Sequence, residues 1–196
     1  YYPAVTPTLS DMLYVFTTSI SMKESSRFLH FVFYLLVILV YLTVYIKKYP
    51  FAPYAALLFV TSPIIIQVAP SAYAEFPWIF CWLLAVFLIT SKRKHTIKDI
   101  ILPAVLIGGT LATKLWMLPF YGAFVVYLLT INIKEDKIKL LKLLFTFTII
   151  SFSIPLLWYL RAYLLTGNPL FPAFWTYPNG EPNNPVHFDF DLESIK

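Results

Sequence analysis

One long uncharged run limits what this chain can fold into more than any other feature. Residues 28–46, FLHFVFYLLVILVYLTVYI, contain no charged side chain, and Lys47 and Lys48 follow directly. The hydrocarbon core of a bilayer is about 30 Å thick, and a helix of about 20 apolar residues crosses it. Residues 28–46 are therefore expected to form a transmembrane helix.

The composition extends this expectation to the rest of the chain. Of 196 residues, 59% are apolar and 13% are charged, whereas about 25% are charged in an ordinary soluble domain. The 19% of aromatic residues exclude disorder, and the single cysteine, Cys81, excludes a disulfide scaffold. The net charge of +5 comes from short runs between apolar blocks, so the expected partner is a lipid bilayer and no nucleic acid.

A second apolar block, residues 100–133, is too long for one crossing, since 1.5 Å per residue gives roughly 50 Å. Gly108 and Gly109 weaken a helix, and Lys114 would place an ammonium group in the middle of the span. We therefore predict a tight turn at Thr113 and Lys114. The expected fold class is an all-α polytopic transmembrane helix bundle, a single multi-pass domain with spans at about residues 28–46, 51–69, 77–90, 100–112, 115–133 and 143–160.

Basic residues predict the orientation, because Lys and Arg concentrate in cytoplasmic loops. With six spans, ten of the 15 basic residues fall on one side: Lys47, Lys48, Lys92, Arg93, Lys94, Lys98, Lys134, Lys137, Lys139 and Lys142. The simplest explanation of these basic loops is that they set the orientation of the chain in the membrane. The chain is expected in the plasma (inner) membrane, with residues 1–27, the 70–76 loop, Lys114 and a polar tail at 161–196 on the non-cytoplasmic side.

The chain begins at Tyr1 without an initiator methionine and stops at Lys196 inside a polar stretch, so we interpret it as a fragment. Near its start, apolar residues recur at helical spacing between residues 9 and 16, which predicts a short interfacial helix on the outer side. Asp11 lies in this segment, either as a helix cap or as a functional carboxylate.

Glu75 is the most informative polar residue on the predicted outer side. It lies in the short loop P-S-A-Y-A-E-F-P, where prolines at both ends fix the path of the chain. One interpretation is a solvated loop carboxylate. The other is a ligand for a metal ion or a substrate, since an ionisable group at the end of an apolar span is costly unless it is paired or useful.

Two cations, Lys114 and Arg161, are held at the same predicted boundary by flanking apolar sequence. They are either anchors whose charged ends reach the interface or donors to a bound phosphate, for which Arg and Lys are the usual partners. Asn168 follows Arg161 in a T-G-N-P turn and either caps that turn or contacts a substrate. His30, near the outer end of the first span, is either a hydrogen-bonded core histidine or a ligand.

No Gly-rich phosphate loop, HExxH zinc motif or serine-hydrolase elbow occurs in the sequence. The opening YYP, the P-S-A-Y-A-E-F-P loop, the G-G-T-L-A-T-K-L segment and the W-Y-L-R-A-Y-L-L-T-G-N-P-L-F-P stretch together resemble bacterial membrane glycosyltransferases of the GT-C superfamily. The likeness is greatest to the group related to dolichyl-phosphate-mannose protein mannosyltransferases.

The resemblance implies a multi-pass enzyme of the cell envelope that moves a sugar, as a hexosyltransferase does, from a polyprenyl-phosphate carrier to a glycan, lipid or protein acceptor. Glu75 would be the acidic residue of the second outer loop, near a divalent cation such as Mg²⁺ or Mn²⁺ or near the donor phosphate. The main catalytic carboxylate of the family lies in the first outer loop, so Asp11 replaces it here or it precedes the chain. Lys114, Arg161 and Asn168 would bind substrate.

The alternative function is a transporter or lipid flippase fragment, in which the same polar residues line a path across the membrane. The interruption at residues 108–114 is the only sign of the broken helices that transporters use, and the chain shows no internal repeat. A structural membrane subunit without activity is the third hypothesis.

Overall fold

The computed structural model describes residues 9–20, 24–71, 75–92, 94–133, 135–166 and 169, apart from the side chains of residues 11, 115, 165 and 166. Within these ranges the chain forms helices and turns and no strand, which confirms the all-α prediction. The elements in chain order are α1 (Leu9–Ile20), α2 (Ser25–Val40) with a π-helical turn (Tyr41–Tyr45), α3 (Ala52–Thr61), α4 (Pro63–Val68), α5 (Glu75–Thr90), α6 (Ile97–Leu111), a 3₁₀ turn (Leu115–Met117), α7 (Leu118–Ile131), α8 (Lys137–Ser153) and α9 (Leu156–Thr166).

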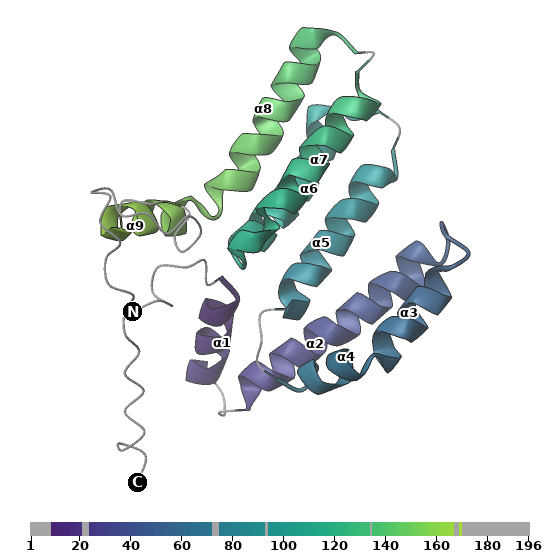
Figure 1. Cartoon of the computed structure of the whole chain (residues 1–196), viewed down its shortest axis with the longest axis vertical. Coiled ribbons are helices and arrows are strands. Elements are labelled where there is room, and N and C mark those ends of the chain that lie inside the picture. The colour runs from purple at the N-terminus through teal and green to yellow at the C-terminus, as the bar shows by residue number, and fades with distance from the viewer. Residues whose placement is uncertain are drawn as a thin grey trace, which may run out of the picture.

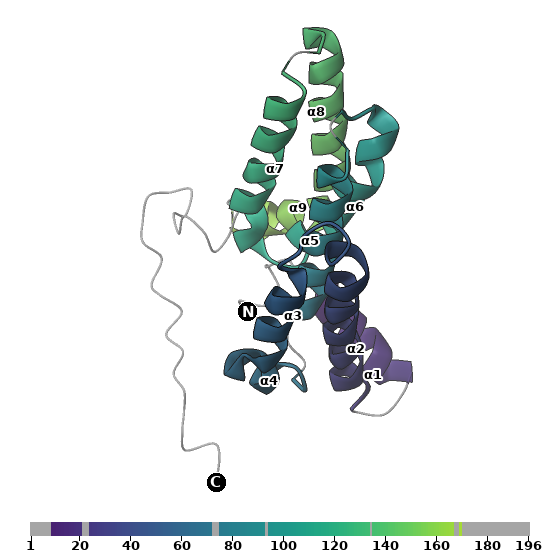
Figure 2. The same cartoon turned by 90° about the vertical axis from the view of Figure 1, so that its right-hand side faces the viewer.

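The long helices lie side by side and most of them alternate in direction (Figures 1 and 2). Helices α2 and α5 run parallel, because the Tyr34 and Phe76 rings lie 5.2 Å apart and, further along both helices, the Tyr45 hydroxyl donates to the Leu83 carbonyl at 2.8 Å. Helix α6 returns antiparallel to α5 after a short connection. The connections between helices therefore collect at two opposite ends of the structure.

We call these the His95 end and the Glu75 end. Of the described residues, the His95 end comprises 46–51, 90–92, 94–97, 131–133 and 135–137. Lys48 reaches from the first of these segments to the Thr90 side chain by a hydrogen bond of 3.1 Å, and an ion pair of 2.7 Å between Lys94 and Glu135 joins the later ones. The Glu75 end comprises α1, the start of α2, residues 69–71, 75 and 76, and residues 111–118.

Helix α6 is central, since it packs against both α5 and α8 and carries a buried row of side chains including Ile100, Ala104, Ile107 and Leu111. The glycines of α6 were expected to weaken it, but the helix continues through Gly108 and Gly109 to Leu111. A Cβ atom on Gly108 would lie 2.7 Å from the backbone oxygen of Ser151 in α8. Gly108 is therefore a contact point where two helices approach closely.

Two of the expected spans are not single helices. The segment at residues 51–69 divides into α3 and α4, because Ser62 is extended (ψ 124°) before Pro63. The segment expected at 143–160 is the second half of α8 and the start of α9, which meet at a bend of 64° around Pro155. Proline has no backbone N–H and its ring clashes with the preceding turn, so a helix bends or stops there.

Because of these breaks, few of the described helices are long enough to cross a bilayer. Among the described residues, one continuous helix, Ser25–Tyr45, is long and apolar enough to cross a bilayer. The bent pair of α8 and α9 would be a second, broken span, and three further apolar helices, Ala52–Thr61, Glu75–Thr90 and Leu118–Ile131, are shorter. The all-helical fold is thus observed, and the six-span membrane topology is a proposal.

Candidate functional site

The structure brings together two residues that the sequence singled out separately. Glu75 is the first residue of α5, and Lys114 follows the last turn of α6. Because α5 and α6 are antiparallel neighbours, the Lys114 ammonium forms an ion pair with Oε1 of Glu75 across 39 residues of chain. Each side chain is 33% exposed, so the pair lies partly inside the protein.

Local hydrogen bonds fix the position of Lys114. Its backbone N–H donates to the Thr110 carbonyl at 3.0 Å, and its own carbonyl accepts from Met117 at 3.2 Å. The Thr113 hydroxyl donates to the Gly109 carbonyl at 2.8 Å, which satisfies one of the carbonyls at the end of α6. The tight turn expected at Thr113 and Lys114 is thus present, and it positions the Lys114 side chain.

Several buried polar atoms without a partner lie on the helices of the Glu75 end. In the described parts of α1, α2 and the first turn of α5, five such atoms accept or donate no hydrogen bond: Oγ of Ser10, Oγ of Ser25, Nε2 of His30, Oε2 of Glu75 and Nε1 of Trp78. Leaving a buried polar atom unpaired costs about 1–3 kcal/mol. A polar ligand that paired with these atoms would recover part of that cost.

The elements around Glu75 explain why these atoms gather there. The His30 ring lies 4.6 Å from the ring of Phe76, the neighbour of Glu75, and its Nδ1 is 3.3 Å from the Ala69 carbonyl. That carbonyl can only accept, so Nδ1 carries the proton and Nε2 is an acceptor. Helix α1 is held by the Leu9 N–H, which donates to the carbonyl of Ala112 at 3.0 Å and so places Ser10 close to the Lys114 turn.

The other predicted site residues are not joined to this pair. Arg161 is exposed on α9 and forms no ion pair with any side chain that the structure describes. Asp11 lies in the first turn of α1, but its side chain is outside the described residues. Asn168 also lies outside the described residues.

From the sequence, Ser10 had no role beyond a helix cap, and His30 was left open between a core histidine and a ligand. Both are almost fully buried, at 1% and 0% exposure. The available signal was their position, because each is a polar residue on an apolar helix and only the three-dimensional packing shows which face is inside. The buried face of α1 carries Ser10 and Tyr14, whereas its apolar residues Met12, Val15 and Phe16 point outward at 52%, 67% and 62% exposure.

The divalent cation that the resemblance implies near Glu75 stays a prediction. In the described ranges no group of three or more His, Cys, Asp or Glu side chains is arranged to hold a metal ion. The partner that the structure gives to the Glu75 carboxylate is the Lys114 ammonium.

Comparison of the chain with family models, with curated proteins and with solved structures finds no match in any of the three. The function therefore has to be argued from the residues and contacts of this chain.

Proposed function

We propose that the chain is part of a membrane glycosyltransferase that moves a sugar from a polyprenyl-phosphate-linked donor to an acceptor on the non-cytoplasmic side. The observation that carries the proposal is the Glu75–Lys114 ion pair, whose second carboxylate oxygen is buried without a partner in the described structure. A carboxylate to take a proton and a cation to hold a phosphate are the two groups that this reaction needs.

The exposed surface supports a bilayer as the environment of the protein. Large apolar side chains are exposed along most helices, for example Phe28 at 70%, Leu58 at 72% and Leu141 at 68%. In α1 and α2 the polar residues Ser10 and His30 are buried, as are Val37 and Val40, while Val15 and Phe28 are exposed. A buried polar residue beside an exposed apolar one is unusual in a water-soluble helix. A surface of this kind is stable in lipid, and a lipid-linked donor would reach the Glu75 end from the same phase.

In the proposed reaction the ion pair opens when the donor binds. The anionic donor phosphate competes with Glu75 for the Lys114 ammonium, which frees the carboxylate to accept the proton of the acceptor hydroxyl. The acceptor oxygen forms a bond to the anomeric carbon of the sugar, and the bond from that carbon to the phosphate oxygen breaks. The electron pair of the broken bond leaves with the phosphate, whose charge Lys114 stabilises.

Three further residues belong to the proposal without support from the described contacts. Arg161 is proposed as a second cation for the donor phosphate, and Asn168 as a polar contact to the substrate. Asp11 is proposed as a second carboxylate near the acceptor, in the helix that also carries the buried Ser10.

The test is sugar transfer by the full-length protein in membranes, supplied with a panel of polyprenyl-phosphate-linked hexoses. Glu75→Gln, Lys114→Ala and Arg161→Ala are expected to lower the transfer rate, the first two by about 100-fold or more. Glu24→Gln is the matched control, because Glu24 also forms an ion pair at the Glu75 end, with Arg27, but its side chain is 67% exposed. Rates near wild type for all three site variants would contradict the proposal.

The transporter alternative stays the second hypothesis, and the broken helix pairs α3–α4 and α8–α9 are of the kind that transporters use. Its sequence support was an interruption at residues 108–114, and α6 continues as a helix to Leu111. Gly108 is accounted for by its contact with α8. The break that remains after α6 is the turn that presents Lys114 to Glu75.

A further inference from the structure

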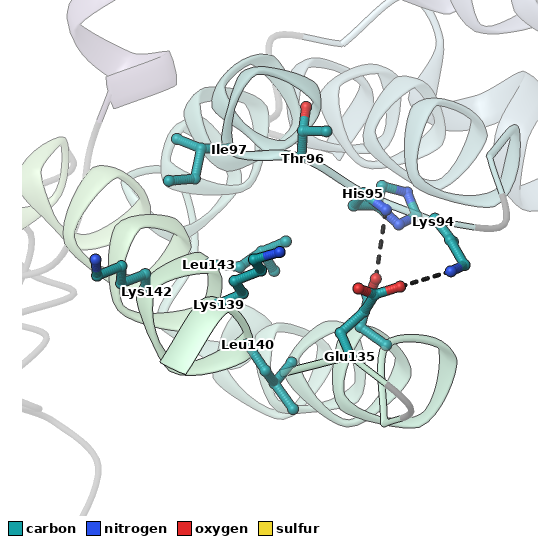
Figure 3. Close-up of a pocket in the computed structure, with 10 residues that line it drawn as sticks. Lys94, His95, Thr96, Ile97, Glu135, Lys139, Leu140, Lys142 and Leu143 are labelled. Carbon is teal, nitrogen blue, oxygen red and sulfur yellow. Dashed lines mark hydrogen bonds and ion pairs between the residues drawn. The ribbon is translucent and has the colours of Figure 1, made fainter. Parts of the chain in front are cut away.

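A cavity of about 370 Å³ lies at the His95 end, on the far side of the structure from Glu75. It is enclosed by the connection from α5 to α6, the connection from α7 to α8 and the first turns of α8 (Figure 3). Its walls combine aliphatic side chains, Ile97, Leu140 and Leu143, with charged and polar groups. A cavity with both kinds of wall suits a ligand that has both a polar and an apolar part.

The charged groups of the cavity leave a net positive charge. Lys94 and Glu135 neutralise each other in an ion pair of 2.7 Å, and the hydrogen bond from Lys94 lowers the pKa of Glu135, so that carboxylate stays ionised and paired. Lys139 and Lys142 form no ion pair with any described side chain. In Figure 3 the Lys139 side chain extends into the cavity, while Lys142 points away from it. The charge of Lys139 also contributes to the lowered pKa of Glu135, but no ion pair holds its ammonium in the described structure, so Lys139 can pair with a bound anion.

His95 adds a buried acceptor to the same cavity. Its side chain is 8% exposed, its Nε2 lies 2.9 Å from the Ile89 carbonyl, and its Nδ1 is buried with no partner among the described residues. The carbonyl can only accept, so the proton is on Nε2 and the free Nδ1 accepts a hydrogen bond. Burial also lowers the pKa of His95, which favours this neutral form.

Together these groups define the chemistry of the ligand. The Lys139 ammonium requires an anionic group, the His95 Nδ1 requires a hydroxyl or amine donor, and the aliphatic walls require hydrocarbon. We propose that this cavity binds the head group of an anionic phospholipid that carries both a phosphate and a hydroxyl, as phosphatidylglycerol does. The inference is independent of sugar transfer at the Glu75 end.

The test is native mass spectrometry of the full chain in a neutral detergent with phosphatidylglycerol or phosphatidylcholine added. The wild type is expected to retain one phosphatidylglycerol molecule in preference to phosphatidylcholine, and Lys139→Gln is expected to weaken that binding by about fivefold or more. Lys137→Gln is the matched control, since Lys137 and Lys139 are both exposed on α8 and lose the same charge, but only Lys139 lines the cavity. It is expected to bind as the wild type does, within about twofold.

A second variant tests the hydrogen bond separately from the charge. His95→Phe keeps a ring of similar size and removes the acceptor, and its melting temperature in detergent shows whether it folds. A folded His95→Phe is expected to lose the preference for phosphatidylglycerol over a phosphatidic acid of the same chains. His95→Gln serves in its place if the phenylalanine variant does not fold, because its amide oxygen restores an acceptor and is expected to keep the preference.

Several results would overturn the proposal. Equal retention of both lipids by the wild type would show that there is no head-group selectivity. Equal weakening by Lys137→Gln and Lys139→Gln would show that the effect comes from the overall charge of the loops. Displacement of the bound lipid by millimolar glycerol 3-phosphate would assign the cavity to a soluble phosphate in place of a lipid.

Discussion

The two ends of this protein each hold a Glu–Lys ion pair between neighbouring helix connections, and the pairs differ in their surroundings. Glu75 and Lys114 are each one-third exposed, and the second carboxylate oxygen of Glu75 is buried without a partner in the described structure. At the other end the Lys94 side chain is 79% exposed, and its partner Glu135 is 33% exposed. Pairing alone therefore does not indicate a site. The lower exposure of its lysine is the feature that distinguishes the Glu75 pair, since a buried unpaired atom, Nδ1 of His95, follows Lys94 at the other end as well.

The largest effect on stability is expected at Gly108, where α6, the helix that joins the two ends, packs closely against α8. Gly108→Ala would push a methyl group against the Ser151 backbone, and overpacking of this kind costs about 1–3 kcal/mol. Gly109→Ala is the matched control, because its nearest neighbour would be the Cys81 sulfur at an ordinary 3.9 Å. Thermal unfolding in detergent should show a lower melting temperature only for Gly108→Ala. Equal effects would contradict the close approach of α6 and α8.

The two ion pairs can be compared directly by double-mutant cycles of unfolding free energy. Glu75→Gln with Lys114→Met is expected to give a coupling of about 1–2 kcal/mol, because the pair is partly removed from water. Glu135→Gln with Lys94→Met is expected to give a smaller coupling, below about 1 kcal/mol, because the Lys94 side chain is 79% exposed. A larger coupling at the Lys94 pair would reverse the distinction between the two ends.

The smallest effect is expected from protonation of His95. Its pKa is lowered in the folded protein by burial, from an ordinary value near 6.5, so the unfolded chain binds the proton more readily. The contribution of His95 to stability is therefore present above about pH 6.5 and is lost as the pH falls below that value. Melting temperatures between pH 7.5 and 5.5 should fall more steeply for the wild type than for His95→Gln. Parallel curves would exclude a neutral buried His95.

Part of this account could be predicted from the sequence. The apolar blocks give an all-helical fold, and the isolation of Glu75 and Lys114 among apolar residues identifies both as unusual. Their pairing could not be predicted from either residue, because it depends on α5 and α6 lying antiparallel with their ends in register. The hydropathy of residues 51–69 and 143–160 likewise gave no sign of the breaks at Pro63 and Pro155, since a bend leaves the apolar composition unchanged.

The cavity at the His95 end could not be predicted from the sequence either. Its lysines are most simply read in the sequence as residues that set membrane orientation, and nothing in their order separates Lys139 from Lys137. The cavity forms only where the α5–α6 and α7–α8 connections meet. There the backbone N–H of His95 donates to Oδ1 of Asn132 at 3.3 Å. Pairwise contacts between distant segments are the information that a single sequence does not carry.

The central claim is that the Glu75 end and the His95 end face opposite sides of a membrane. It can be tested with a membrane-impermeant maleimide in cells that express the protein with Cys81→Ser and one new thiol, at Glu24→Cys or at Lys98→Cys, both exposed positions. The account predicts labelling of Glu24→Cys in intact cells and labelling of Lys98→Cys only after the membrane is permeabilised. Labelling of Lys98→Cys in intact cells while Glu24→Cys stays protected would contradict it.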